Sequence, residues 1–474
     1  MQEYKRQIVV IGGGAGGIYV SSVLSRLGYN VTLIDKRHSL GGDRLHSGCV
    51  PSKAFIKAAQ AAHCASHAYS RYGIDCQVKV EFAKIQEYVN GVIAHMQKYD
   101  SPMRFKSYGV NIIYGNGHFV GDHMLSVDDK LIPAEKFIIA TGSRPSIPNI
   151  EGLDQINYYT NENILSIPEQ PKRLIILGGG TIGLEYAQAF VRLGTKVIVL
   201  EQNSQLMLYS SQPQIKFLKE ILITEGIEFL TSIKINKIVK NNNSNNIELL
   251  SDSHDPVTGD ALLIAVGREP EHDDLGLDLV EIAHSPHGII VDEYLRTSKK
   301  NIYAIGDVIE SPYKFTHVAE YHSRLVIDNI AFRKQKKVTY NSVPMVLFTD
   351  PEFAQVGLTE QLAKERNIRY KLIDYQLLKL DRAMINNEGD GSIRLLVKNN
   401  KLLGASILSP NASELIQELA LAIDNKIPIY KIVETIHAYP TWSQMIPRAI
   451  NKHFEPKLFS NLSKFYIRMR QFMD

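Results

Sequence analysis

The sequence predicts an α/β protein in which two β-α-β units of the same design precede an α+β domain. Two glycine-rich turns, beginning at Gly12 and Gly178, each stand between a β-branched run and a helical stretch. From about residue 341 the pattern changes to alternating strands around one apolar helix over 414–423, without a third glycine-rich turn. The length of 474 residues allows roughly three folding units, which agrees with this division.

The first unit has the residues that a dinucleotide site requires. Strand-like sequence over 7–11 leads into a G-x-G-x-x-G turn, and a helix over 18–27 is followed by a strand over 31–34 that ends at Asp35. The glycines of the turn are Gly12, Gly14 and Gly17. In this Rossmann-like arrangement one glycine makes the tight turn, one admits a pyrophosphate and one lets helix and strand pack closely. The helix amino terminus then faces the phosphates, and Asp35 can accept hydrogen bonds from ribose hydroxyls.

The second unit repeats the first after 166 residues. A strand over 173–177, a helix over 184–193 and a strand over 196–200 surround the turn, and Glu201 corresponds to Asp35. The glycines of this turn are Gly178, Gly180 and Gly183. Two dinucleotide sites predict electron transfer between a permanently held nucleotide and an exchanging one, for which a flavin and a nicotinamide dinucleotide are the obvious pair. Because Glu201 would repel a 2′-phosphate and no lysine or arginine follows it before residue 216, we predict NADH rather than NADPH, unless a more distant basic residue folds in.

Two later segments, 140–145 and 265–270, each follow a strand-like run. They are typical of paired turns where the chain crosses between two nucleotide domains, and they place Thr141, Gly142 and Gly267 near the cofactors. Asp307 follows a further strand and a glycine. Its carboxylate can bind polyol hydroxyls, although this pattern alone is also typical of a simple turn.

Composition excludes several classes of protein. Hydrophobic residues make up 44% and charged residues 22% of the chain, as in globular rather than disordered proteins. No apolar run approaches the roughly 18 residues that span a bilayer, and the polar start predicts no signal peptide. Three cysteines are too few for a disulfide scaffold or a metal cluster, so we expect a cytoplasmic protein without a metal site. Residues 1–450 carry no net charge, which argues against nucleic-acid binding.

On these residues the sequence resembles the class I pyridine nucleotide–disulfide oxidoreductases, which include dihydrolipoamide dehydrogenase, glutathione reductase and mercuric reductase. The resemblance covers residues 7 to about 450, and the segment 348–352 and the basic end are most similar to the mercuric-reductase-like branch. It implies a homodimer with Rossmann-like FAD and NAD(P) domains. The implied divisions are an FAD-binding domain over 1–155, an NAD(P)-binding domain over 156–275, a segment completing the FAD site over 276–340, an α+β dimerisation domain over 341–450 and a tail over 451–474.

The resemblance also implies further cofactor-binding residues, namely Lys36, Gly42, Lys53, His118 and Ala319. In the family the lysine at position 53 lies beside the reactive ring nitrogen of the flavin. It pairs with a glutamate just after the second glycine turn, which here is Glu185. A buried lysine–glutamate pair is costly without a purpose, so its retention indicates that hydride transfer from NADH to FAD is intact.

The redox motif of the family has two cysteines separated by four residues, and this sequence keeps only the second. Arg44 stands at the first position and Cys49 at the second, so no disulfide can form within the motif. Cys64 lies roughly 20 Å further along one predicted helix, beyond the ~7 Å between Cα atoms that a disulfide allows. We expect Cys64 and Cys76 to be structural. Cys49 lies at a helix amino terminus, which stabilises a thiolate. This thiolate either contacts the flavin ring, cycles through a sulfenic acid or is capped by a small thiol, or Cys49 is an inactive relic packed on the flavin.

The acid–base motif also departs from the family. Tyr439 stands at the catalytic histidine position and Gln444 at the glutamate position, and His437 matches a position without the main role. Since exchange with a disulfide needs two cysteines, we predict an FAD-dependent NADH oxidoreductase with another acceptor. Oxygen, a quinone, a metal ion or a second nicotinamide nucleotide are the candidates. The alternatives are a dihydrolipoamide dehydrogenase or mercuric reductase working by an altered route, and a flavin-binding redox sensor without activity.

The tail over 451–474 carries five basic residues and two acidic ones, which accounts for the whole net charge of +3. Its apolar residues recur at helical spacing, and they are Leu458, Leu462, Phe465, Tyr466, Met469, Phe472 and Met473. The pattern predicts an amphipathic helix. This helix either docks on its own dimer or contacts a membrane surface or another partner.

Overall fold

The computed structural model describes residues 6–240 and 246–471. These residues form two compact units, which we describe separately. The first unit contains the described residues up to Ala62 together with Lys79–Gln202 and Ile233–Thr339. The second contains His63–Val78, Asn203–Ser232 and the described residues from Tyr340 onward. Among the described residues no helix has both the length and the apolar character needed to cross a bilayer.

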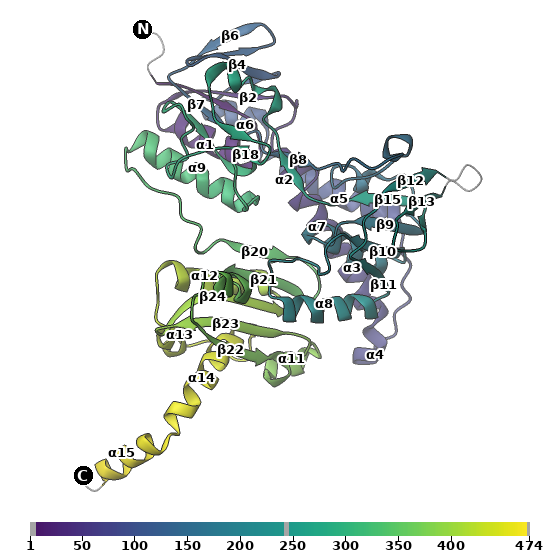
Figure 1. The fold of residues 1–474 in the computed structure, drawn as a ribbon, viewed down its shortest axis with the longest axis vertical. Helices are drawn as coiled ribbons and strands as arrows, with labels where there is room; N and C mark the ends of the chain where they lie inside the picture. The colour runs from purple at the N-terminus through teal and green to yellow at the C-terminus, as the bar shows by residue number, and fades with distance from the viewer. Residues whose placement is uncertain (1–5, 241–245, 472–474) are drawn as a thin grey trace. The chain divides into compact units, whose positions relative to one another are not determined.

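A parallel five-stranded sheet forms the centre of the first unit, in the order β19-β7-β1-β2-β3. Its strands are β1 (Gln7–Ile11), β2 (Asn30–Asp35), β3 (Asn111–Tyr114), β7 (Lys136–Ile139) and β19 (Ile302–Ala304). Residues 8–11 of β1 are buried, as expected for a strand with structure on both faces of the sheet. Helices α1 (Ala15–Arg26) and α9 (Thr316–Ala331) pack side by side against this sheet (Figure 1).

The second β-α-β element also lies in the first unit. Strands β9 (Arg173–Leu177), β10 (Lys196–Glu201) and β15 (Ala261–Ile264) run parallel, and helix α7 (Thr181–Arg192) connects the first two. Both predicted helices therefore begin three residues earlier than expected. The reason is that the glycine turns already contribute helical hydrogen bonds, since Ile18 donates to Gly14 and Leu184 donates to Gly180, each at 3.0 Å.

The two crossing turns pair as predicted. Strands β8 (Ser143–Pro145) and β16 (Arg268–Pro270) form an antiparallel ribbon. The other strands of the first unit are β4 (Gly117–Gly121), β5 (Met124–Val127), β6 (Lys130–Pro133), β12 (Lys237–Lys240), β13 (Ile247–Leu250), β14 (Val257–Gly259), β17 (His284–Ser285) and β18 (Gly288–Ile289). Its remaining helices are α2 (Gly42–His46), α5 (Phe82–Gln97), α6 (Pro102–Ser107) and the first part of α3 (Cys49–Ser66).

The second unit contains the predicted α+β domain. Its antiparallel sheet has the order β20-β21-β24-β23-β22, with strands β20 (Pro344–Leu347), β21 (Glu352–Gly357), β22 (Lys371–Gln376), β23 (Ser392–Lys398) and β24 (Lys401–Ser409). Helix α12 (Ala412–Asp424) packs on strands β21 and β24, which confirms the predicted apolar helix. The remaining helices and strand are α4 (Ala68–Tyr72), α8 (Gln212–Thr224), β11 (Ile227–Thr231), α10 (Glu360–Glu365), α11 (Asp381–Asn386), α13 (Ile429–Glu434), α14 (Met445–Leu458) and α15 (Asn461–Gln471).

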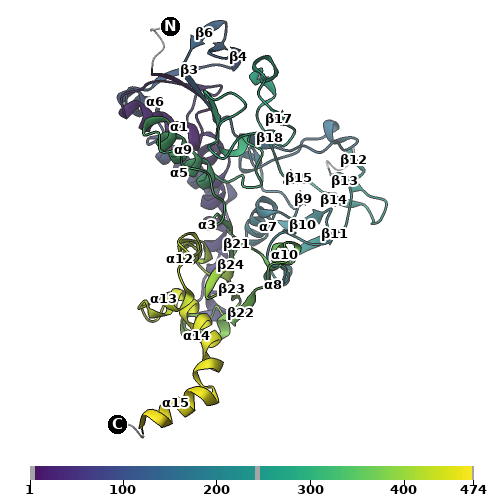
Figure 2. The same cartoon turned by 60° about the vertical axis from the view of Figure 1, so that its left-hand side comes forward.

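The predicted tail helix is present as the end of α14 and as α15. Figures 1 and 2 both show α15 standing clear of the sheet of the second unit. Of the apolar residues predicted for this helix, Phe472 and Met473 lie outside the described residues.

Candidate functional site

The first glycine turn has the clearance that contact between a backbone and a phosphate requires. Gly12 has a φ of 107°, and a Cβ there would lie 2.3 Å from the carbonyl oxygen of Ala140. A Cβ on Gly17 would lie 1.8 Å from the carbonyl oxygen of Gly12. A Cβ on Gly14, by contrast, would meet nothing within 4 Å, so open space lies above this residue. The outer two glycines thus allow close packing, and the middle one leaves room for a ligand at the amino terminus of α1.

The second turn repeats this geometry. Gly178 has a φ of 109°, and a Cβ on Gly183 would lie 2.0 Å from the carbonyl oxygen of Gly178. A Cβ on Gly180 would again meet nothing within 4 Å. At the end of β10 the Glu201 carboxylate accepts a hydrogen bond from the Gly179 amide at 2.8 Å. The second turn is therefore also shaped for a dinucleotide.

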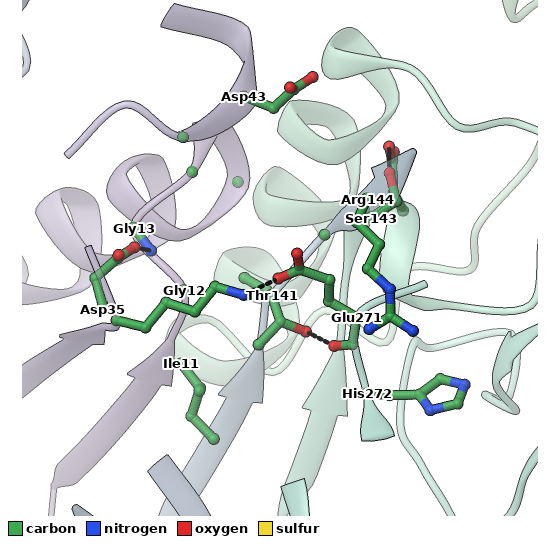
Figure 3. A pocket seen from close by; sticks show the side chains of 18 of the residues that line it. Ile11, Gly12, Gly13, Asp35, Asp43, Thr141, Ser143, Arg144, Glu271 and His272 are labelled. Carbon is green, nitrogen blue, oxygen red and sulfur yellow. Dashed lines mark hydrogen bonds and ion pairs between the residues drawn. The ribbon is translucent and has the colours of Figure 1, made fainter. Parts of the chain in front are cut away.

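Asp35 holds the first turn from the end of β2. Its carboxylate accepts hydrogen bonds from the amides of Gly13 at 2.5 Å and Arg37 at 2.7 Å. Burial raises the pKa of Asp35, while these hydrogen bonds and the charges of Arg37 and Lys36 oppose the rise. The carboxylate is thus held rigidly, with its side chain directed at the glycine turn (Figure 3).

One cleft of the first unit brings together most of the residues predicted to bind FAD (Figure 3). Those that line it are Gly12, Gly14, Asp35, Lys36, Gly42, Thr141, Gly142, Asp307 and Ala319. Gly17 lies beneath the turn, where it packs on Gly12. His118, also predicted to bind FAD, is not among the residues that line this cleft. On β4 this residue is exposed while its neighbour Phe119 is buried, so the cleft is lined there by residues 115–117 instead.

The cleft also contains residues that the sequence did not indicate. The Glu271 carboxylate forms an ion pair with Lys36 at 2.8 Å. The backbone carbonyl of Glu271 accepts a hydrogen bond from the Thr141 hydroxyl at 2.6 Å. His272 lines the cleft next to it. Both residues follow directly after β16, the strand that Gly267 precedes. The sequence offered only one hint of this arrangement, the expected pairing of the two crossing turns. That antiparallel pairing places the residues after 270 next to those before 143.

A chain of polar contacts holds Asp307 in the cleft. The Arg268 guanidinium donates to the Ser143 hydroxyl at 2.8 Å, and this hydroxyl donates to the Asp307 carboxylate at 2.8 Å. Burial raises the pKa of Asp307, whereas the hydrogen bond from Ser143 and the charges of Arg268 and Lys314 lower it. The glycine turns, the open space above Gly14 and these carboxylates together fit the pyrophosphate and hydroxyl groups of FAD.

His322 supports the Asp307 segment from helix α9. Its side chain is fully buried, and Nδ1 accepts a hydrogen bond from the Gly306 amide at 3.1 Å. Burial lowers the pKa of His322 to about 4, against 6.5 for an exposed histidine. The folded protein therefore binds fewer protons than the unfolded chain between these two values.

From this difference we expect the protein to lose stability as the pH falls from 6.5 to about 4, and no further loss from His322 below that range. The His322→Gln variant, which cannot titrate, should lack this component. Between pH 7 and pH 4.5 its free energy of unfolding should fall by about 2–3 kcal/mol less than that of the wild type. Chemical denaturation at both pH values measures the two changes, and parallel losses in the two proteins would contradict the assignment.

Cys49 begins helix α3 and is exposed, with its Sγ 3.4 Å from the hydroxyl of Thr316. Arg44, at the position of the missing cysteine, forms an ion pair with Asp100. Asp100 is only 8% exposed, so the pair is largely removed from solvent. The guanidinium of Arg44 is therefore bound to the Asp100 carboxylate.

All three cysteines are free. Cys49 and Cys64 lie on the one helix α3, as predicted. The expectation that Cys64 and Cys76 are structural was wrong in that both are exposed and neither belongs to a core. Among the described residues no group of three or more His, Cys, Asp or Glu is placed to hold a metal ion.

The predicted pair of Lys53 and Glu185 is present. Lys53 Nζ lies 2.8 Å from Glu185 Oε2, joining helices α3 and α7 within the first unit. The Glu185 side chain is 6% exposed, whereas that of Lys53 is 33% exposed, so the lysine end of the pair is partly accessible to solvent. Tyr186, next to Glu185, is fully buried against Phe55, and burial raises its pKa. The carboxylate of Glu185 therefore lies in a largely apolar setting, which strengthens its attraction to the lysine.

The altered acid–base motif lies in the second unit. Tyr439 is 67% exposed, whereas the side chain of His437 is largely buried, with Nε2 3.2 Å from Glu418 Oε1. Gln444 ends the short helical turn Trp442–Gln444. Tyr439 is thus exposed within this chain, and its side chain contacts the Asp381 carboxylate, whose pKa the Arg448 guanidinium and this contact lower.

Comparisons with known proteins agree with this architecture. Residues 6–323 match the family model described as pyridine nucleotide-disulphide oxidoreductase, and residues 343–450 match the dimerisation domain of that family. Among relatives, mercuric reductase of Staphylococcus aureus is 30% identical over 443 residues, which cover 92% of this chain and 80% of that one. Dihydrolipoyl dehydrogenase of Geobacillus stearothermophilus is 33% identical over 453 residues, covering 94% and 95% respectively.

A solved structure shows the same fold. The HOCl-induced flavoprotein disulfide reductase RclA from Escherichia coli, solved as a Cu(II) complex, superposes with a TM-score of 0.84 at 27% identity. The similarity covers 93% of this chain and 98% of that one. Members of the family depend on FAD and use NADH or NADPH, and the dimerisation domain supports a homodimer. The fold, both glycine turns and the extent of these matches lead to one conclusion, that the chain belongs to the class I pyridine nucleotide–disulfide oxidoreductases.

Proposed function

We propose that this protein is an FAD-dependent NADH oxidoreductase whose electron acceptor is not a disulfide. The observation that carries the proposal is the contrast between two ion pairs in the first unit. The pair of Lys53 and Glu185 retains the machinery beside the flavin, while the pair of Arg44 and Asp100 occupies the place of the first redox cysteine. Bound FAD supplies the acceptor for a hydride from NADH.

The residues of the chain have separate roles in this proposal. The amino terminus of α1 binds the pyrophosphate, and Asp35 and Asp307 accept hydrogen bonds from hydroxyl groups of the cofactor. Lys53 places a positive charge beside the flavin ring, and Glu185 keeps that lysine oriented. Cys49 contributes a single thiol, which can form a sulfenic acid but cannot complete an intramotif disulfide.

A survey of acceptors tests the proposal. The flavin-loaded protein is mixed with NADH in a stopped-flow instrument, and then with oxygen, a quinone, Cu(II), Hg(II), NADP⁺, lipoamide or glutathione disulfide. Cu(II) and Hg(II) are included because RclA was solved with Cu(II) and a relative is named a mercuric reductase. We expect rapid bleaching by NADH and reoxidation by at least one acceptor other than the two disulfides.

Two results would contradict the proposal in different ways. Disulfide turnover faster than that of every other acceptor would indicate a dihydrolipoamide dehydrogenase working by an altered route. The absence of bleaching would indicate a flavin-binding redox sensor, for which the exposed thiol of Cys49 would be the reactive group.

We also propose that NADH is the preferred nucleotide, because Glu201 stands at the end of β10 where a 2′-phosphate would lie. The Glu201→Gln variant keeps an acceptor for the Gly179 amide and removes the negative charge. The ratio of kcat/KM for NADPH over NADH should therefore rise roughly tenfold. The matched control is Glu220→Gln, an exposed glutamate on α8, and an unchanged ratio in Glu201→Gln would contradict the assignment.

A further inference from the structure

Helix α15 exposes an apolar face that nothing else in the described chain covers. No residue of α15 is buried, and Leu462 and Phe465 are 79% and 60% exposed. The spacing of its large apolar residues places four of them on one face, namely Leu462, Phe465, Tyr466 and Met469. Leu458 and Phe459, just before the helix, are exposed as well. Such a concentration of exposed apolar side chains marks an interaction surface rather than ordinary solvent exposure.

The charges of α15 are all of one sign. The helix contains Lys464, Arg468 and Arg470 and no acidic residue. Lys464 and Arg468 lie on the side opposite the apolar face, and Arg470 lies at its border. Ion pairs between residues that the structure describes do not involve these three cations. The helix is therefore apolar along one side, while the other side carries the cations together with one exposed apolar residue, Ile467.

The size and position of α15 disfavour a protein partner. Its eleven residues make a helix about 16 Å long and ~10 Å wide, whose one face is far smaller than the ~800 Å² that each partner contributes to a stable protein interface. The match to the dimerisation domain ends at residue 450, so α15 lies outside the segment that the family uses for dimerisation. At the surface of a bilayer with anionic lipids, by contrast, the boundary between headgroups and acyl chains can take the apolar face of the helix, and the negative headgroups next to it can take the cations.

We propose that α15 binds this protein to the surface of bilayers that contain anionic lipids. Leu462, Phe465, Tyr466 and Met469 enter the boundary between headgroups and acyl chains, and the three cations lie at the headgroups. One short helix gives reversible binding to the surface, not insertion across the bilayer. A flavoprotein held in this way would meet acceptors dissolved in the lipid phase.

Sedimentation with vesicles tests the proposal on the full-length, flavin-loaded protein. Vesicles of phosphatidylcholine alone are compared with vesicles containing 30% phosphatidylserine at low and high salt. We expect binding to the anionic vesicles, at least tenfold weaker binding to the neutral ones, and release as the salt concentration rises.

Three variants separate the two sides of the helix. Arg468→Gln with Lys464→Gln should weaken binding on the order of 25-fold, at roughly fivefold for each cation removed. Phe465→Asn should reduce binding to both kinds of vesicle. The matched control is Met103→Gln, which removes an apolar side chain that is 80% exposed on α6 and should leave binding unchanged.

A different set of results would overturn the proposal. Equal binding to both kinds of vesicle, or binding that survives the loss of both cations, would show that anionic lipid is not the partner. If the protein does not bind vesicles and Phe465→Asn instead shifts the dimer–monomer equilibrium in sedimentation equilibrium, α15 docks on its own dimer. Since these variants lie far along the chain from both glycine turns, bleaching by NADH should stay normal in every case and the test is independent of the proposed function.

Discussion

Replacing Lys53 with methionine should slow the reduction of the flavin by NADH about 10²–10³-fold. Methionine keeps the length of the side chain but removes the charge that lies 2.8 Å from Glu185. The loss of one preorganised charge beside a reacting centre typically costs this much in rate. It also leaves the carboxylate of Glu185, only 6% exposed, without its cation. Stopped-flow bleaching under anaerobic conditions measures the rate directly.

The neighbouring lysine on the same helix provides the control. Lys57 lies one turn further along α3, where it is exposed and contacts Gln60. Lys57→Met should therefore bleach at the wild-type rate. The double variant Lys53→Met with Glu185→Gln should recover thermal stability but not rate, because it removes the unpaired carboxylate without restoring the positive charge. If Lys53→Met bleaches within twofold of the wild type, the pair is structural.

The sequence predicted the features that depend on residues close together in the chain, namely the strands and the glycine turns. The strands β1 and β9 were predicted to the residue, and the crossing turns were predicted to pair, because short β-branched runs followed by glycine leave few alternatives. The clearance above Gly14 follows from the same local pattern. Both glycine turns could therefore be placed before any tertiary contact was known.

What the sequence could not predict depends on contacts between distant residues. Asp100 lies 56 residues from Arg44, and nothing in either segment indicates that the two side chains meet. The same is true of Glu271 and Lys36, which are 235 residues apart. These long-range contacts determine the chemistry of the site, whereas the local pattern determines the strands and turns that hold it.

The contact between Arg44 and Asp100 changes what restoring the missing cysteine should do. Arg44→Cys alone would leave the carboxylate of Asp100 largely buried and without its partner, at a cost of about 2 kcal/mol. We expect this variant to melt at a lower temperature than the wild type. The double variant Arg44→Cys with Asp100→Asn removes the stranded charge, so its loss of stability should be smaller than the sum of the two single losses.

The double variant should also gain a redox centre. Oxidation joins the introduced sulfur to that of Cys49 and releases two electrons and two protons, which makes the protein a four-electron rather than a two-electron acceptor per flavin. An anaerobic titration with NADH counts these electrons, and thiol titration should show two fewer free thiols after oxidation than before. Arg104→Cys, a thiol introduced at an exposed position on α6, is the matched control and should keep the two-electron count.

Disulfide reductase activity should nevertheless stay low in the double variant. Tyr439 and Gln444 still occupy the positions from which the family draws its acid–base pair, and tyrosine is a poor base near neutral pH. The variant should therefore take up four electrons and pass few of them to lipoamide or glutathione disulfide. Rapid turnover of either disulfide would show that the arginine was the only obstacle. A count of two electrons per flavin would show that position 44 cannot form the disulfide even when the ion pair is gone.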